Sequence, residues 1–141
     1  DRDQERAIVA RHGHRSTMPD LTAFDVQRVA SLADLSDIRS AVARLRITDD
    51  LIDYIVDLVR ATREHPSLSV GASPRAANML AIASRAHAAL QGRDYVIPDD
   101  IQTLALPALR HRIQLSPGAE IEGVTTESVV NAILAEIAAP R

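Results

Sequence analysis

The chain contains no cysteine, lysine or tryptophan in its 141 residues, and only three aromatic side chains. Without cysteine it can form neither a disulfide nor a thiolate metal site. Without lysine it cannot form a phosphate-binding loop of the Gly-x-x-x-x-Gly-Lys-Ser/Thr type. The core must be built from Leu, Ile, Val and Ala, a composition that favours close-packed helices over a sheet rich in aromatic residues. These absences predict an all-α domain and give little support to self-contained catalysis.

Excess positive charge and long apolar runs are also missing. The formal net charge of -3 argues against general nucleic-acid binding, which usually needs a basic surface. No apolar run approaches the length needed to span a bilayer, and the charged N-terminus does not resemble a signal peptide. We therefore expect a cytoplasmic protein without a membrane segment. The chain begins at Asp1 and not at Met, so we expect further residues upstream.

Apolar periodicity and helix start and stop signals predict a small helical bundle of six to eight helical segments. The stretches 13–21, 65–72 and 113–124 are expected to be mostly loops, and 93–97 a short, locally extended link. The expected helices are 3–12 ending at Gly13, one from Thr22 or Asp25 to about Leu32, 37–46 with Ser36 as its cap, 49–64, 74–91, one from Pro98 that Pro107 kinks or splits, and one from Thr125 or Thr126 to about Ala138.

Four aspartates stand at two of the expected helix starts, namely Asp49, Asp50, Asp99 and Asp100. The helix dipole alone explains acids at these positions, so we interpret them as capping residues. The five histidines show no spacing typical of metal ligands: His12 and His14 are two residues apart, and His65, His87 and His111 are isolated. We therefore expect no metal site and no catalytic residue in this chain.

The start of the 74–91 helix differs from the acidic ones. Ser73 suits the N-cap, where its hydroxyl can accept a backbone hydrogen bond, and Pro74 suits the first helical position. Arg75 then falls in the first turn, where the dipole disfavours a cation and welcomes an anion. An arginine beside free N–H groups predicts a phosphate-binding position, with Ser73, Pro74 and Ala76 forming the helix start. The alternative is that Arg75 simply extends into solvent.

A second cationic cluster, Arg110-His111-Arg112, lies at an expected helix C-terminus. Cations are favoured at such an end on electrostatic grounds, which is sufficient to explain the cluster. Contact with a partner or a nucleotide is the alternative interpretation, and the sequence leaves both open.

Five blocks in order resemble the C-terminal helical lid of MoxR-type AAA+ ATPases. They are residues 54–63 (YIVDLVRATR), 71–76 (GASPRA), 92–96 (GRDYV), 98–101 (PDDI) and 109–112 (LRHR). The tail 118–124 also looks like this family, and residues 13–43 match it less distinctly. The opening residues 1–6 resemble the connection that leaves the ATP-binding core in such proteins.

The resemblance implies that Arg75 is the sensor-2 residue, which reaches the γ-phosphate of ATP held by the neighbouring core domain. It implies residues 1–45 as N-terminal helices leading from that core and residues 46–141 as the lid. It also implies ATP and Mg²⁺ as cofactors of a bacterial parent protein, a homo-oligomeric ring, and chaperone-like remodelling or maturation of partners such as von Willebrand A domain proteins. Arg110, His111 and Arg112 become candidates for contact with the core or a neighbouring subunit.

The phosphate-binding loop, the Mg²⁺-binding acid and an arginine finger are not among these residues, so we expect the chain alone neither to hydrolyse ATP nor to bind it tightly. Two other functions remain as alternatives. A free-standing helical adaptor would bind protein partners without nucleotide dependence. A DNA-binding helical domain would show binding that falls steeply with salt, and the acidic balance disfavours it.

Overall fold

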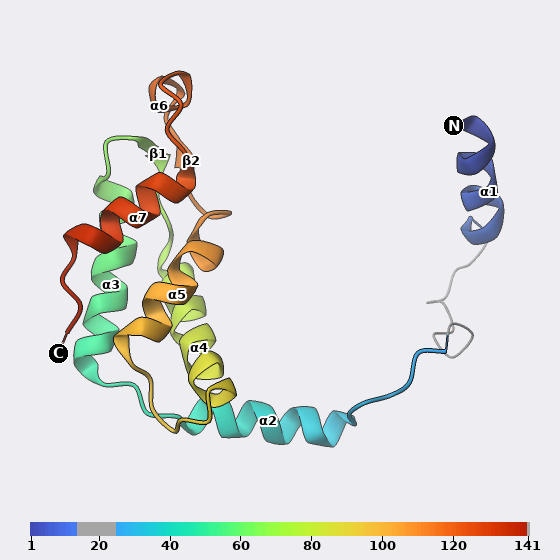
Figure 1. Ribbon diagram of the computed structural model, residues 1–141, viewed down its shortest axis with the longest axis horizontal. Coiled ribbons are helices and arrows are strands. Elements are labelled where there is room, and N and C mark those ends of the chain that lie inside the picture. The colour runs from blue at the N-terminus through green and yellow to red at the C-terminus, as the bar shows by residue number, and fades with distance from the viewer. Residues whose placement is uncertain (14–24, 141) are drawn as a thin grey trace. The chain divides into compact units, whose positions relative to one another are not determined.

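The computed structural model describes residues 1–13 and 25–140 and shows seven helices and two short strands among them (Figure 1). The chain divides into two compact units, residues 1–35 and residues 36–141. The mostly helical fold predicted from composition and periodicity is confirmed. None of the helices in the described ranges is both long enough and apolar enough to cross a bilayer.

In the first unit, helix α1 (Arg2–His12) begins one residue earlier than predicted, with Asp1 as its N-cap, and ends at Gly13, as predicted. It has no buried residue, and Ile8 and Val9 are 61% and 66% exposed. Thr22 and most of the predicted loop 13–21 lie outside the described residues. The predicted helix from Thr22 or Asp25 to about Leu32 is wrong over its described part, since residues 26–31 are not helical.

Helix α2 (Leu32–Arg44) begins five residues earlier than the predicted start at Asp37. Ser31 and Asp34 explain the difference, because they cap each other's backbone: the Ser31 N–H donates to Asp34 Oδ2 at 2.7 Å and the Asp34 N–H donates to Ser31 Oγ at 3.1 Å. Ser36 is therefore an interior residue of the helix and not its cap. α2 crosses the boundary between the two units and has no buried residue.

The body of the second unit consists of α3 (Asp49–Glu64), α4 (Pro74–Leu90), α5 (Pro98–Leu109) and α7 (Thr126–Glu136). α4 packs against α3 and α5, and α7 packs against the same two helices (Figure 1). α3 carries the broad apolar stripe that its sequence predicted, and its bounds match the predicted ones. The buried side chains are those of the predicted composition, mainly Leu, Ile, Val and Ala.

Two predictions for helices of the body differ from the structure, one on the continuity of α5 and one on the end of α7. α5 continues through Pro107 without splitting, because Pro107 is exposed and the helix is held by buried Ala105 and Leu109 on either side of it. A proline inside a helix removes one backbone hydrogen bond, and the packing of this helix outweighs that loss. α7 is capped by Thr125, as predicted, and ends at Glu136, two residues short of the predicted end.

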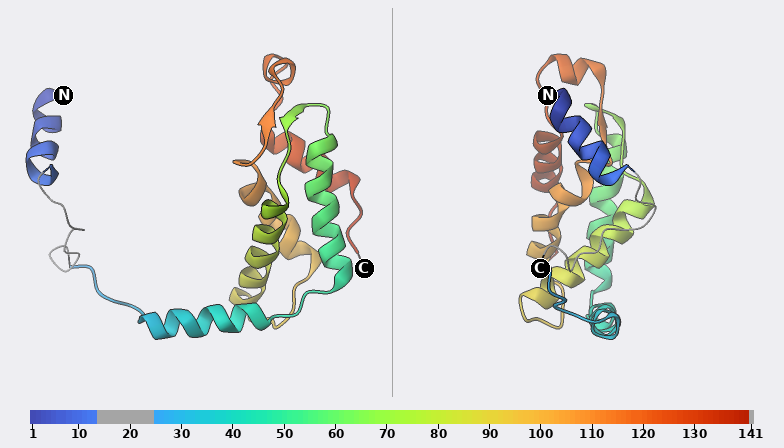
Figure 2. Two further views of the ribbon diagram at one scale, coloured as in Figure 1. Left: turned by 180° about the vertical axis from the view of Figure 1, so that it is seen from behind. Right: turned by 90° about the vertical axis from the view of Figure 1, so that its right-hand side faces the viewer.

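The predicted loops contain a small antiparallel sheet at one end of the body (Figure 2). Strand β1 (Leu68–Val70) pairs with β2 (Gln114–Leu115), and the Ser69 hydroxyl donates to the Gln114 and Leu115 carbonyls. Helix α6 (Pro117–Ile121) follows β2. The strands are too short to produce an alternating pattern in the sequence. The extended link at 93–97 is confirmed by a parallel bridge between Arg46 and Tyr95.

Candidate functional site

The first turn of α4 contains the predicted phosphate-binding residues. Ser73 is the N-cap and Pro74 occupies the first helical position, as expected. Ala76 is fully buried, whereas Ser73, Pro74 and Arg75 are exposed. Ser73 makes no side-chain capping hydrogen bond, which corrects the prediction that its hydroxyl closes the helix end. The start of α4 therefore presents Arg75 and an uncommitted hydroxyl at the surface.

The segment before this turn is fixed to the end of α3. The Ala72 N–H donates to Thr62 Oγ1 at 2.8 Å, and the Thr62 hydroxyl donates to the Val59 carbonyl at 2.6 Å. Gly71 lies against Arg63 so closely that an added Cβ would be 2.6 Å from the Arg63 Cα. Gly71 is thus required by close approach to α3 and not by an unusual φ. The sequence analysis included Gly71 only within the block 71–76, and it missed Thr62, which the α3 pattern shows only as one more inward-facing position.

The electrostatics of the α4 start favour an anion. The first turn holds no acidic residue, in contrast to α3 and α5, which each have two. The partial positive charge at a helix N-terminus and the Arg75 guanidinium add together at this place. An anion that binds there gains a charge-assisted hydrogen bond from the guanidinium. The geometry is therefore suited to a phosphate group that another domain or subunit presents.

The second cationic cluster follows α5, with Arg110 as its C-cap. Arg110 and His111 are exposed, while Arg112 is partly buried and its Nε has no hydrogen-bond partner among the described residues. His111 and Arg112 line a groove of about 330 Å³, whose remaining walls are apolar: Met79, Ala83, Leu104, Pro107 and Ala108. The apolar walls of this groove, with His111 and Arg112 among its lining residues, are suited to contact with a protein partner.

Met79 connects the two predicted clusters. It lies four residues after Arg75 on α4, and residues at this spacing share one face of a helix. Arg75 and the groove that contains His111 and Arg112 are therefore on the same side of α4.

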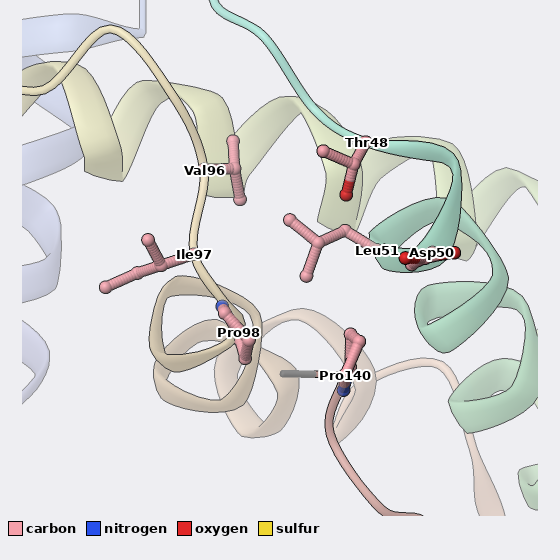
Figure 3. A pocket seen from close by; sticks show the side chains of 7 residues that line it. All are labelled: Thr48, Asp50, Leu51, Val96, Ile97, Pro98 and Pro140. Atoms are coloured by element: carbon pink, nitrogen blue, oxygen red, sulfur yellow. The ribbon is translucent and has the colours of Figure 1, made fainter.

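A different pocket, of about 180 Å³, lies where the starts of α3 and α5 meet the C-terminal segment (Figure 3). Thr48, Asp50 and Leu51 line it from α3, Val96, Ile97 and Pro98 from the α5 start, and Pro140 from the C-terminal segment. None of the predicted site residues lines it. Asp50 makes it unsuited to phosphate, so the pocket does not compete with Arg75 as a nucleotide contact.

Asp100 does more than the predicted capping. Its side chain is 1% exposed and accepts hydrogen bonds from Arg93 Nη2 at 2.6 Å, Arg93 Nη1 at 2.8 Å and the Ile97 N–H at 2.9 Å. His87 Nδ1 of α4 lies 2.7 Å from Asp100 Oδ1. Burial alone would raise the pKa of Asp100, but the hydrogen bonds from Arg93, Ile97 and His87 together lower it to about 2. This network joins the end of α4 to the start of α5. The sequence analysis placed Arg93 and Asp100 in two blocks of the family resemblance but did not predict that they contact each other.

Asp49, Asp50 and Asp99 occupy the first turns of their helices, as expected for acids at the positive end. The N-caps themselves are Thr48 and Ile97, so none of the four aspartates occupies the capping position. Across the residues that the structure describes, no group of three His, Cys, Asp or Glu side chains could hold a metal ion.

Comparisons with known proteins identify the family of this chain. Residues 60–133 match the AAA lid domain family. The chain is 32% identical to the chaperone MoxR1 of Mycobacterium tuberculosis over 148 aligned positions that cover 99% of the chain. It is 41% identical to the uncharacterised protein YeaC of Bacillus subtilis over 82% of the chain. A solved structure of a candidate ATPase from Cytophaga hutchinsonii superposes with a TM-score of 0.78 at 32% identity, over the whole chain.

The chain spans only 36% and 37% of the lengths of YeaC and MoxR1, and 44% of the solved chain. The matched family range includes Thr62, Arg75, Asp100 and the cluster after α5. The resemblance drawn from the five sequence blocks is therefore confirmed: the chain belongs to the AAA lid domain family and is related to the MoxR proteins.

Proposed function

We propose that the chain is the helical lid of a longer MoxR-like AAA+ ATPase, in which Arg75 contacts the γ-phosphate of ATP bound by the core domain. The observation that carries the proposal is the exposed arginine in the first turn of α4, at a helix start with no acidic residue and no side-chain cap. A cation there stabilises charge on the transferred phosphoryl group and is held less firmly once that group is gone. The lid then moves as a rigid body with nucleotide state.

The described residues provide only part of what a site for ATP and Mg²⁺ needs. The γ-phosphate is matched by Arg75 and the N-terminus of α4, with Ser73 available as a further hydrogen-bonding group. The described residues hold no cluster of metal ligands, so the Mg²⁺ that accompanies ATP belongs to the core in this proposal. The chain alone should therefore show neither tight ATP binding nor turnover. The relevant activity is that of the intact protein.

The groove between α4 and α5, on the side of α4 that carries Arg75, is the proposed contact with the core or with a neighbouring subunit. The apolar walls contributed by α4 and α5 are suited to a partner that excludes water from the groove. The exposed Arg110, which precedes His111 in the chain, provides positive charge for an acidic partner surface. A homo-oligomeric ring in the cytoplasm, with von Willebrand A domain proteins as remodelled partners, completes the proposal.

The experiment is ATP hydrolysis by the intact protein with Arg75→Ala, compared with wild type. We expect turnover to fall about 100-fold, because one preorganised charge at a transferring group contributes this much. Arg60→Ala is the matched control, since Arg60 is an exposed arginine of the same unit that forms only a 3.9 Å pair with Glu64. Arg60→Ala should keep turnover within about twofold, because exposed ion pairs contribute little.

Wild-type turnover by the folded Arg75→Ala protein would overturn the proposal. Arg75 would then be a solvated surface residue, and the free-standing adaptor would become the better account.

A further inference from the structure

The hydroxyl of Thr62 is used twice within the described structure. It donates to the Val59 carbonyl at 2.6 Å and accepts the Ala72 N–H at 2.8 Å. Thr62 is one of three polar or charged residues that are fully buried in the described ranges, and it has no exposed surface. The first of these hydrogen bonds stays within α3, whereas the second leaves the helix and holds the segment that begins α4. Thr62 is therefore a link between two elements and not only a satisfied core residue.

Ala72 stands directly before the N-cap Ser73 and three residues before Arg75. Three contacts hold the chain at Gly71 and Ala72. Thr62 binds the Ala72 N–H, Gly71 lies against the Arg63 backbone, and the Ala72 side chain is buried in a cluster that includes Val59 and Ala76. A hydrogen bond to a buried backbone N–H is costly to lose, because no water can replace it.

We propose that Thr62 is a positioning residue for Arg75: its hydroxyl fixes the Ala72 backbone and so determines where the first turn of α4 presents the guanidinium. The inference rests on the proposed function of Arg75 as the γ-phosphate contact. A group that stabilises a transferring phosphate must be held to within about half an ångström, and its supporting residues determine that precision. Thr62 itself touches no reacting group.

The test uses the intact ATPase with Thr62→Val, which keeps the shape of the side chain and removes the hydroxyl. We expect turnover at saturating ATP to fall about tenfold or more, since small misplacements of a catalytic group have effects of this order. Thr62→Ser keeps the hydroxyl and should restore turnover to within about threefold of wild type. These expectations depend on hydrogen bonding to Ala72 and not on side-chain volume.

Ser84 supplies a matched control. It is equally buried on α4, and its hydroxyl donates to the Leu80 carbonyl at 2.9 Å within the same helix. Ser84→Ala therefore removes a buried hydroxyl without touching the segment before Arg75, and its turnover should stay near that of wild type. If Ser84→Ala lost as much turnover as Thr62→Val, the effect would be general loss of packing and the inference would be overturned.

The double variant Thr62→Val with Arg75→Ala separates positioning from stability. If Thr62 acts through Arg75, removing its hydroxyl should change nothing further once Arg75 is gone. An additional loss of the same size in the Arg75→Ala background would contradict the inference. If Thr62→Val fails to fold, the turnover of Thr62→Ser is compared with that of Thr62→Ala at a temperature at which both variants are folded. These two variants differ only in the hydroxyl, so equal turnover would contradict the inference.

The outcomes distinguish the two proposals. A large loss with Arg75→Ala but full turnover in Thr62→Val overturns the positioning role and leaves the proposed function intact. Unchanged turnover in Arg75→Ala overturns the proposed function itself.

Discussion

Helices α4 and α5 pack against each other and both begin with a proline, yet their first turns have opposite characters. The α5 start contains Asp100, which is buried and surrounded by donors from Arg93, Ile97 and His87. The α4 start contains Arg75, which is exposed, has the charge that the dipole disfavours, and follows an N-cap without a side-chain hydrogen bond. The first is complete within the domain. In our proposal the second is completed by an anion from outside the chain.

The comparison shows how to separate a stabilising helix start from a functional one. At a stabilising start the charge matches the dipole and its partners are in the same fold. At the α4 start, which we propose to be functional, the charge opposes the dipole and the Thr62 hydroxyl accepts the Ala72 N–H just before the helix. Substitutions at the two starts should therefore affect different properties.

The largest effect on stability is expected from Asp100→Ala. It removes a buried carboxylate and leaves the partly exposed Arg93 guanidinium and the Ile97 N–H without their acceptor, and hydrogen bonds to a charged group of this kind contribute about 2 kcal/mol or more. Urea unfolding of the 141-residue chain measures this. Asp99→Asn is the control, because Asp99 is an exposed acid of the same turn, and it should change stability by less than about 0.5 kcal/mol. Equal effects of the two substitutions would contradict the assignment.

Acid should reveal the same network. The pKa of Asp100 is lowered to about 2 in the folded chain from an ordinary value of 3.8. The ionised form of Asp100 therefore stabilises the fold at pH values above 3.8. This contribution, about 2 kcal/mol, is lost as the pH falls from about 5 to below 2. Unfolding free energies of wild type and Asp100→Asn should therefore converge as the pH is lowered. A difference that stayed constant over this range would show that Asp100 is not ionised in the way described.

A smaller loss is expected from Gly71→Ala. The new Cβ would lie 2.6 Å from the Arg63 Cα, so the backbone must shift, at a cost of about 1 to 2 kcal/mol. Gly118→Ala in α6 is the matched control, because its Cβ would meet open space. That variant should unfold within about 0.5 kcal/mol of wild type. If Gly71→Ala were equally neutral, the close approach between Gly71 and α3 would not be important for the fold.

The smallest effect is expected from Arg75→Ala on the stability of the chain. The substitution removes a cation from the positive end of α4 and adds a better helix former, so unfolding free energy should stay within about 0.5 kcal/mol and tend to rise. Thermal unfolding with and without the substitution checks this. A loss above about 1 kcal/mol would make the α4 start structural, like that of α5.

The sequence predicted some of these features and not others, for identifiable reasons. The bounds of α3 followed from its apolar stripe and acidic first turn, and the α4 start followed from Ser73 and Pro74. The start of α2 was misjudged because two serine-acid signals compete there, and the Ser31–Asp34 pair forms the cap. A helical pattern cannot show which of several plausible caps will be used.

The sequence analysis predicted a role for Arg75 but not the contacts of Asp100 and Thr62. Arg75 stood out because its charge conflicts with the helix dipole, which is a local property of the sequence. Asp100 and Thr62 did not stand out, because an acid at a helix start and a threonine on a buried face have ordinary local explanations. Their partners, Arg93 and Ala72, are seven and ten residues away, and the roles follow from where the chain turns.

The central claim is that Arg75 recognises the γ-phosphate, and nucleotide discrimination tests it most directly. The measurement is the affinity of the intact protein for a slowly hydrolysed ATP analogue and for ADP, in wild type and Arg75→Ala. The account predicts that Arg75→Ala weakens the analogue about tenfold or more and leaves ADP nearly unchanged, because only the analogue carries the group that Arg75 contacts. Equal affinities for both nucleotides before and after the substitution would contradict it.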